Sequence, residues 1–213
     1  MNKFPRSAYI HIPFCHRRCF YCDFAVIPLG NKIESSQGYG SKTIKEYLHF
    51  LYKEILSIKH KSPLSTIYIG GGTPSILCPQ QIKDLIILFK ENYGLDYGAE
   101  ITMEVDPASF NQDDLYGFIN AGINRFSLGA QSFNNQILQN AGRRHLREDV
   151  EKCCSWLKKT YDSGLIKSWS LDLIQNLPLS GFREWQEDLK KTINFFPPHI
   201  SIYDLNIENG TVF

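Results

Sequence analysis

The feature that most constrains the fold of this chain is a regular alternation of short apolar runs with longer helical patterns. Six runs rich in β-branched or aromatic residues have the length of strands: Ala8–Phe14, Thr66–Gly70, Glu100–Val105, Arg125–Leu128, Ser168–Ile174 and His199–Asn206. Between them, apolar residues recur at spacings of three and four, which is typical of amphipathic helices. The expected helices are Thr43–Lys59, Pro79–Tyr93, Gln112–Ala121, Asn134–Lys159 with a break near Gly142, and Phe182–Phe195.

Repeated strand–helix units indicate parallel strands joined by right-handed crossovers. Six units are too few to close an eight-stranded barrel, so this order predicts an α/β fold and leaves a partial barrel and a doubly wound sheet open. The chain has 213 residues, of which 43% are hydrophobic and 21% charged, as is ordinary for a globular domain. Its net charge of +1 gives no broad attraction to nucleic acid or acidic membranes. No apolar run reaches the roughly 20 residues of a transmembrane helix.

Polar groups stand where the expected strands end. A cysteine-containing loop follows the first strand, and the GGGTPS stretch, Gly70 to Ser75, follows the second. Glu104 and Asp106 end the third strand, Gln131 follows the fourth, and Asp172 lies in the fifth. Ligands of parallel α/β proteins bind at the carboxyl ends of the strands. We therefore expect these groups to gather at one rim of the sheet.

Three cysteines, Cys15, Cys19 and Cys22, form a C-x3-C-x2-C run. A four-iron cluster needs a ligand on each iron, so three thiolates leave one iron open for a ligand that is not a protein side chain. Two other readings remain open. One is a structural zinc site with His11 or His16 as fourth ligand, although such sites usually pair two cysteine knuckles and the chain has no second one. The other is a set of unrelated buried thiols.

The remaining cysteines, Cys78, Cys153 and Cys154, are scattered along the chain, and the first residues show no signal-peptide pattern. No disulfide framework is expected, and a reducing compartment, the cytoplasm, fits best. One segment, from about residue 27 to residue 42, is rich in Gly and Ser and is expected to be a mobile loop.

Several residues at the expected rim have both a binding and an ordinary structural interpretation. The GGGTP turn lacks the lysine of a phosphate loop, but its glycines let the backbone approach a ligand closely. Glu104 could accept from a ribose hydroxyl or an ammonium group, or be a solvated carboxylate. Arg143 could pair with a carboxylate, or lie in an exposed helix–helix turn. Asp172, inside an apolar strand, needs a partner to offset its desolvation.

Longer motifs carry a resemblance to a known family. They are YIHIPFC, CFYCDF, GGGTPS, EVDP, LGAQSF, GRRH, DLIQNLP and SIYDLNIENGTVF, and they run from about Ala8 to the last residue. Together they resemble the radical S-adenosylmethionine (SAM) superfamily, and within it the oxygen-independent coproporphyrinogen III oxidase-like family with its haem chaperone branch. The resemblance implies a partial (β/α)6 barrel with parallel strands, a [4Fe–4S] cluster, and SAM that chelates the open iron.

By position, the resemblance makes Cys15, Cys19 and Cys22 the cluster ligands. It also implies a set of SAM contacts, which are Tyr9, Tyr21, Gly71, Gly72, Thr73, Glu104, Gln131, Arg143 and Asp172. Tyr21 matches the aromatic side chain beside the adenine, and the GGT loop matches the one that contacts the methionine moiety. No residue is matched to a catalytic role.

Two departures from the family refine the expected function. The cysteine motif of the oxidases resembles C-x3-C-x2-C-x-C. In this chain Phe24 stands at the position of the last cysteine, which favours the chaperone branch. Family members also continue into a final barrel helix and a C-terminal cover domain. We therefore expect residues 1–213 to be a radical SAM core domain whose cover domain is missing.

The expected function is a haem chaperone that binds haem and passes it to an unidentified acceptor protein, with an electron donor for the cluster. One alternative is an enzyme, a coproporphyrinogen III oxidase that decarboxylates propionates by radical chemistry, so the resemblance leaves open whether the chain is catalytic. A structural zinc domain is a weaker alternative.

Overall fold

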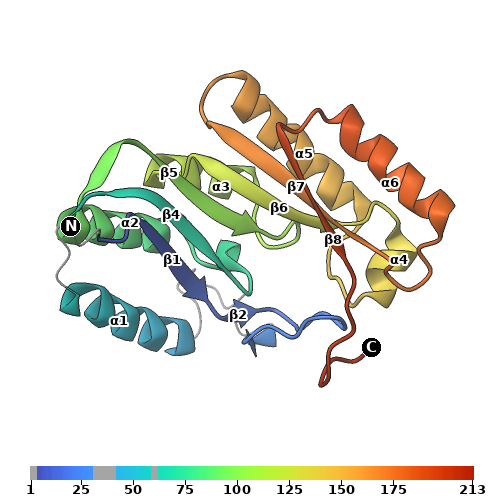
Figure 1. The fold of residues 1–213 in the computed structure, drawn as a ribbon, viewed down its shortest axis with the longest axis horizontal. Helices are drawn as coiled ribbons and strands as arrows, with labels where there is room; N and C mark the ends of the chain where they lie inside the picture. The colour runs from blue at the N-terminus through green and yellow to red at the C-terminus, as the bar shows by residue number, and fades with distance from the viewer. Residues whose placement is uncertain (1–3, 31–41, 59–61) are drawn as a thin grey trace.

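The computed structural model describes residues 4–30, 42–58 and 62–213, and its centre is one sheet of six parallel strands (Figure 1). The strands are β1 (Ser7–Ile12), β4 (Leu64–Gly71), β5 (Leu95–Val105), β6 (Arg125–Gln131), β7 (Ser168–Gln175) and β8 (His199–Asp204). They lie side by side in chain order, and every neighbouring pair is parallel. β1 and β8 are the two edges, so the sheet is open.

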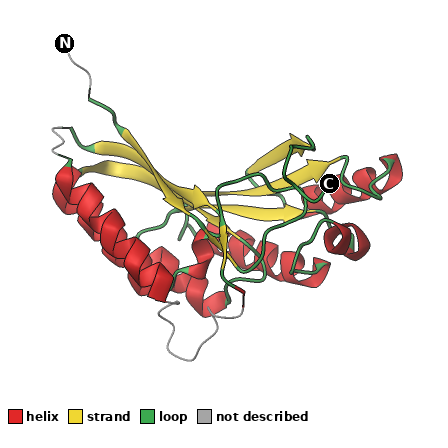
Figure 2. Cartoon of the chain, turned by 90° about the horizontal axis from the view of Figure 1, so that it is seen from below, coloured by secondary structure: helices red, strands yellow, loops and turns green. Residues whose placement is uncertain are grey.

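The connecting helices lie on one side of this curved sheet and leave the other side open (Figure 2). They are α1 (Lys42–Ser57), α2 (Pro79–Tyr93), α3 (Gln112–Ala121), α4 (Asn135–Asn140), α5 (Arg147–Asp162) and α6 (Phe182–Asn194). Because the strand order never reverses, right-handed crossovers place every connecting helix on the same face. A doubly wound sheet would need such a reversal. The expected partial (β/α)6 barrel is confirmed.

The strand sequences explain why one face is covered and the other open. Ile67 and Ile69 in β4 are at most 1% exposed and belong to the core under the helices. Tyr68, between them, projects to the opposite face, because successive side chains of a strand alternate. β5 repeats the pattern, with Met103 in the core and Glu104 on the open face. Each buried aliphatic side chain stabilises the fold by about 2 kcal/mol, so the apolar set fixes the register.

Two expected helices, Pro79–Tyr93 and Gln112–Ala121, have the observed bounds. The second begins with a capping box, because the Asn111 side chain accepts from the Asp114 amide at 3.0 Å and the Asp114 carboxylate accepts from the Asn111 amide at 3.0 Å. It ends at Gly122, whose φ of 116° favours glycine. Local capping signals therefore set these ends.

The break expected near Gly142 separates α4 from α5. Gly142 has a φ of +75°, and a Cβ built there would lie 2.8 Å from Cδ1 of Phe20. Glycine is required at this position for both reasons. β4 and β5 begin earlier than expected, because Leu64 pairs with Leu95 ahead of a register shift.

Part of the segment from residue 27 to residue 42 has regular structure. Ile27–Pro28 form β3, which pairs in parallel with β2 (Phe14–Cys15), and Lys42 begins α1. Residues 31–41, in which the mobile loop was expected, lie outside the described residues. Within the described ranges, no helix combines the length and the apolar character needed to cross a membrane.

Candidate functional site

A cavity of about 450 Å³ lies at the carboxyl ends of the parallel strands. Eleven of the twelve residues expected to hold cluster or cofactor line it, namely Cys15, Cys19, Cys22, Tyr21, Gly71, Gly72, Thr73, Glu104, Gln131, Arg143 and Asp172. They come from the loop after β1 and from the ends of β4, β5, β6 and β7, together with the α4–α5 turn. The structure thus brings to one place residues that are far apart in the sequence.

The cysteine loop is fixed by backbone hydrogen bonds at both ends. The Leu29 amide donates to the Cys15 carbonyl at 2.8 Å, and the Phe20 amide donates to the Ala141 carbonyl at 3.0 Å. Cys15 is 9% exposed, and burial raises the pKa of its thiol to about 11, although the hydroxyl of Thr73, 3.4 Å from its Sγ, acts in the opposite direction. An iron ligand at this position must lose that proton, so ligation and deprotonation are coupled.

The glycine loop approaches the cysteine loop too closely for any side chain. A Cβ built on Gly72 would lie 2.7 Å from the carbonyl oxygen of Phe14 and 2.8 Å from Sγ of Cys15. A Cβ on Gly71, whose φ is +118°, would lie 2.8 Å from Nδ1 of His11. Glycine at both positions therefore leaves room beside the first cysteine.

The donor set fits a cluster with one open iron. All three cysteines are free thiols and face the same cavity. Across the described part of the chain, no group of three or more His, Cys, Asp or Glu side chains is arranged to hold a single metal ion. A cubane differs from a single ion, because each thiolate binds a different iron.

Glu104 links the end of β5 to the glycine loop. Its carboxylate accepts from the hydroxyl of Tyr68 at 2.8 Å and from the amide of Gly71 at 3.2 Å. Burial raises the pKa of Glu104, while both hydrogen bonds favour the charged form and lower it. The carboxylate is therefore held against the glycine loop with capacity left to accept from a ligand.

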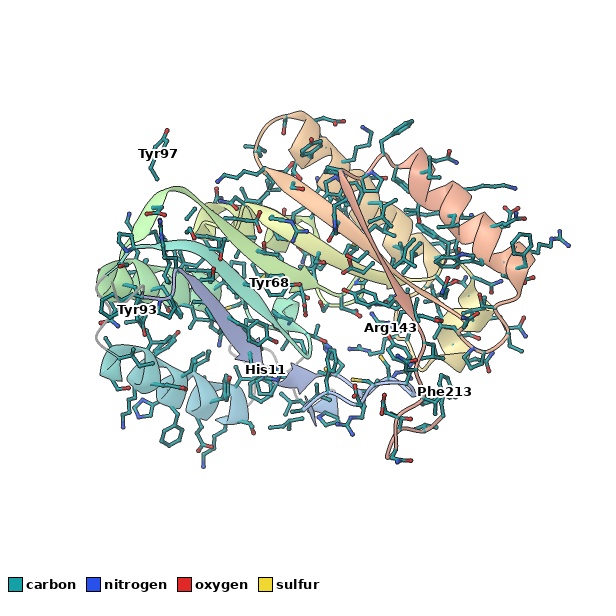
Figure 3. The ribbon with its side chains drawn as sticks, viewed as in Figure 1. His11, Tyr68, Tyr93, Tyr97, Arg143 and Phe213 are labelled. Atoms are coloured by element: carbon teal, nitrogen blue, oxygen red, sulfur yellow. The ribbon has the colours of Figure 1, made fainter. Side chains whose placement is uncertain are left out.

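Arg143, which is labelled in Figure 3, forms hydrogen bonds with four groups of the site through its guanidinium. It donates to the carboxylate of Asp106, to Sγ of Cys19 at 3.3 Å, to the hydroxyl of Tyr21 at 3.3 Å and to the carbonyl of Gly129 at 3.1 Å. This arrangement places a fixed positive charge beside the sulfur of Cys19.

Asp106, which was expected at the rim without an assigned role, is the ion-pair partner of Arg143. Burial disfavours its charge, but the Arg143 guanidinium and a hydrogen bond from His145 outweigh burial and hold the pKa of Asp106 well below its usual range. His145 is completely buried, and its Nε2 lies 3.1 Å from the carbonyl of Ala130. A charged residue directly after a buried strand, in the sequence VDP, was the available signal for this role.

Asp172 lies within β7, and Gln131 is the last residue of β6. Oδ2 of Asp172 accepts from the hydroxyl of Ser127 at 2.7 Å, and its Oδ1 accepts from Ser170 at 3.3 Å, which supplies the partners that its desolvation requires. Oε1 of Gln131 and Nε of Arg143 are buried and have no hydrogen-bond partner among the described residues. Orphaned polar atoms at a cavity wall are available to a ligand.

Tyr9 is the expected contact that does not line the cavity. It is 59% exposed, its hydroxyl lies 3.1 Å from Nδ1 of His11, and its ring stacks on Tyr68 with centroids 6.1 Å apart. It lies within β1, ahead of the strand's carboxyl end at Ile12. Its expected role remains a prediction.

A sequence model described as the radical SAM superfamily matches residues 9–170. Curated relatives named "Heme chaperone HemW" are similar over nearly the whole chain. The protein of Synechocystis sp. is 40% identical over 98% of this chain and 49% of its own length, and that of Escherichia coli is 34% identical over 98% of this chain and 53% of its own length. The chain thus spans about half the length of these relatives.

Among solved structures, the coproporphyrinogen III oxidase of Escherichia coli, described as a radical SAM enzyme, has a TM-score of 0.79 at 30% identity. The match covers 95% of this chain and 44% of the oxidase. A more distant structure, anSMEcpe with bound AdoMet, has a TM-score of 0.64 at 14% identity over 95% of this chain and 52% of its own, and shows likeness of fold alone.

Proposed function

Because this chain belongs to the radical SAM superfamily, we propose that Cys15, Cys19 and Cys22 hold a [4Fe–4S] cluster and that SAM binds at the fourth iron. We further propose that the protein carries haem to an acceptor protein. The observation that supports the cofactor site most strongly is the convergence of three free thiols, a glycine loop and two orphaned polar atoms on one cavity. When bound, such a cluster supplies an electron to SAM.

The residues at the cavity divide the binding of SAM between them. The backbone of Gly71 and Gly72, with Thr73, would contact the methionine end beside Cys15, where a side chain at position 72 has no room. Glu104 would accept from the SAM ammonium or a ribose hydroxyl, because it retains acceptor capacity beyond its two hydrogen bonds.

Gln131, Arg143 and Asp172 would close the cavity on the side of β6 and β7. The Gln131 amide oxygen is an acceptor for a ligand hydroxyl or amine, and Asp172 is already oriented by two serine hydroxyls. Tyr21 stands with its hydroxyl on Arg143, so its ring would be held in place beside the adenine. Tyr9 would act at a distance, through His11.

The haem-carrier function is supported by the relatives and by one residue of the cluster loop. Curated relatives named as haem chaperones are 33–40% identical to this chain over nearly its whole length. Phe24 stands at the position of the fourth cysteine in the oxidase-like motif. It lines the cavity and is 58% exposed. An apolar ring at the mouth suits a flat, hydrophobic ligand. Such a protein would work in the cytoplasm with an electron donor for the cluster.

The second candidate is oxidative decarboxylation of coproporphyrinogen III, favoured by the similarity to the Escherichia coli oxidase. Anaerobic incubation of the chain with that substrate, SAM and a reductant separates the two functions. We expect no protoporphyrinogen to form in that incubation. When haem is added to the chain instead, we expect it to bind and its Soret band to shift. Conversion of the substrate would contradict the chaperone function, and the absence of haem binding would contradict haem carriage by this chain.

The cofactor assignment is tested by anaerobic reconstitution with iron and sulfide. The wild-type chain should bind about four iron and four acid-labile sulfide ions. Cys19→Ala and Cys22→Ala should lose the cluster. Cys153→Ala is the matched control, because that thiol is buried on α5 with its Sγ 3.7 Å from the Pro107 carbonyl. Equal iron in all variants, or zinc without sulfide, would contradict the assignment.

A further inference from the structure

Gln131 has a backbone conformation that needs an explanation. Its φ is +61°, in the left-handed region that favours glycine, and the amide of Ser132 donates to the carbonyl of Ala130 at 2.8 Å across it. This is a three-residue turn with a positive φ at its centre, a rare and strained geometry. Strain of this kind persists only where the surrounding structure holds it in place.

The residue that holds this turn lies outside the cavity, on α6. Oδ2 of Asp188 accepts from the hydroxyl of Ser132 at 2.7 Å, and its Oδ1 accepts from the amide of Phe133 at 2.8 Å. Asp188 thus uses both carboxylate oxygens on the two residues that follow Gln131. The stacking of Phe133 on Phe195, with centroids 6.1 Å apart, adds an apolar contact near the end of α6.

Burial of this carboxylate has no structural explanation within α6 itself. Asp188 is 3% exposed, and among the described residues it forms no salt bridge. Burial raises its pKa, while the bonds from Ser132 and Phe133 and the charge of Lys191 oppose that shift. Burying a carboxylate costs free energy unless hydrogen bonds offset the loss of water. Here the bonds from Ser132 and Phe133 do so.

Gln131, at the centre of this turn, is one of the residues that line the cavity. Its Oε1 is buried without a partner, and its Nε2 lies so close to Gly129 that a Cβ there would be 3.1 Å away. The amide is thus folded over the end of β6, and β6 shows a register shift against β7 between Gly129 and Gln131. A ligand with an N–H or O–H donor would satisfy the orphaned oxygen.

We propose that Asp188 is a positioning residue of the cavity, which holds the Ala130–Ser132 turn through Ser132 and Phe133 so that the Gln131 amide oxygen receives a hydrogen bond from the ligand. The inference rests on the proposed function in taking SAM as that ligand. Asp188 acts through Gln131 and does not touch SAM.

A double-mutant cycle tests this coupling in the cluster-loaded chain, with SAM affinity measured by equilibrium dialysis. Asp188→Leu and Gln131→Met should each raise the Kd about tenfold, the effect of losing one ligand hydrogen bond. The double variant should be no weaker than Gln131→Met alone, because the two act in one pathway. Losses that multiply, or no loss in Asp188→Leu, would overturn the proposal.

Two further variants separate positioning from packing. Asp188→Asn keeps an acceptor for the Phe133 amide and a donor for Ser132, so its affinity should stay within about twofold of wild type. Thr192→Val changes a fully buried α6 side chain, four residues on, whose hydroxyl has no hydrogen-bond partner among the described residues. It should leave the Kd unchanged, and a tenfold loss there would assign the effect to packing of α6.

A readout without SAM distinguishes failure of this inference from failure of the proposed function. Hydrogen exchange of the Ser132 and Phe133 amides should be faster in Asp188→Leu and unchanged in Thr192→Val. If Asp188→Leu does not fold, Ser132→Ala, which removes one of the two bonds, takes its place. Unchanged exchange would overturn the positioning role. A wild-type protein that shows the exchange effect without binding SAM would contradict only the proposed function.

Discussion

Single atoms decide how closely the loops of the cavity approach one another. At Gly72, the missing Cβ would meet the Phe14 carbonyl at 2.7 Å and the Cys15 sulfur at 2.8 Å. Both are fixed, because one is backbone and the other belongs to an expected iron ligand. A single ion pair also sets the charge around one cysteine. Arg143 pairs with Asp106 and donates to the sulfur of Cys19.

We expect Gly72→Ala to weaken cluster binding, because the new methyl group must displace either the cysteine or the backbone of its loop. Changes next to metal ligands typically cost about 10- to 100-fold in metal affinity. The readout is iron content after anaerobic reconstitution. Gly181→Ala is the control, because its Cβ would meet only the flexible Glu184 carboxylate, at 3.0 Å. Equal iron in both variants would refute the steric argument.

We expect Asp106→Asn to lower the free energy of unfolding at pH 7 by about 3 kcal/mol, because it leaves Arg143 without its anion. The Asp106 side chain keeps 22% of its surface exposed, which places the loss at the lower end for buried pairs.

The loss should depend on pH in one direction. The folded pKa of Asp106 lies below the unfolded value near 4, so its contribution is complete above that pH and fades as the pH falls further. Urea unfolding of both proteins at pH 7 and at about pH 3 measures this. A difference that grows on acidification would contradict the sign.

Elements that are distant in the chain hold the cysteine loop from outside. Phe20 donates its amide to the α4–α5 turn, and its carbonyl accepts from the amides of Val212 at 2.9 Å and Phe213 at 3.2 Å. Figure 1 shows the segment after β8 descending toward the same loop. The ring of Phe213 packs edge-on against Phe20, with centroids 6.2 Å apart.

Removal of residues 211–213 should therefore loosen the cysteine loop without unfolding the sheet. Phe20 then loses two backbone hydrogen bonds and one aromatic contact, each worth about 1 kcal/mol. The measurable result is faster hydrogen exchange of the Phe20 amide and faster iron loss to a chelator. Val212→Ala, which keeps both amides, should behave as wild type. Unchanged exchange in the truncated chain would exclude a role for this segment.

The whole molecule combines an apolar, helix-covered face with a polar, open face of one parallel sheet. The cavity lies at the carboxyl ends of the strands, which belong to both faces of the sheet. Ligand binding there is therefore coupled to the stability of the entire sheet. The cavity collects residues from the cysteine loop through to the segment after β8, so a bound ligand would oppose their separation on unfolding.

SAM at 100 times its Kd should stabilise the cluster-loaded protein by about 2.7 kcal/mol, which raises the melting temperature by about 5–10 °C in a domain of this size. Without the cluster, the amino and carboxyl groups of SAM lack their iron, and the shift should be much smaller. Thermal unfolding under anaerobic conditions, with and without cluster, measures the difference. An equal shift in both forms would contradict binding at the iron.

Local patterns were sufficient for much of the fold. The apolar periodicity of α2 and α3 predicted their bounds. For α3, Asn111 and Gly122 mark the two ends, because each acts on residues within one turn. The alternation of apolar and polar residues in β4 and β5 agrees with which of their side chains enter the core. Strand starts at Leu64 and Leu95 were missed, because their pairing joins residues 31 apart, and the glycines around Leu95 interrupt the strand pattern.

The amino-acid sequence by itself determined the number and order of the βα units, the cysteine spacing and the placement of polar residues after strands, since each depends on neighbours in the chain. Tertiary structure alone decided which of these residues meet. The contact of Arg143 with Cys19 spans 124 residues, and that of Asp188 with Ser132 spans 56. The tertiary structure likewise shows that Tyr9 does not line the cavity, since it lies within β1, ahead of the strand's carboxyl end at Ile12.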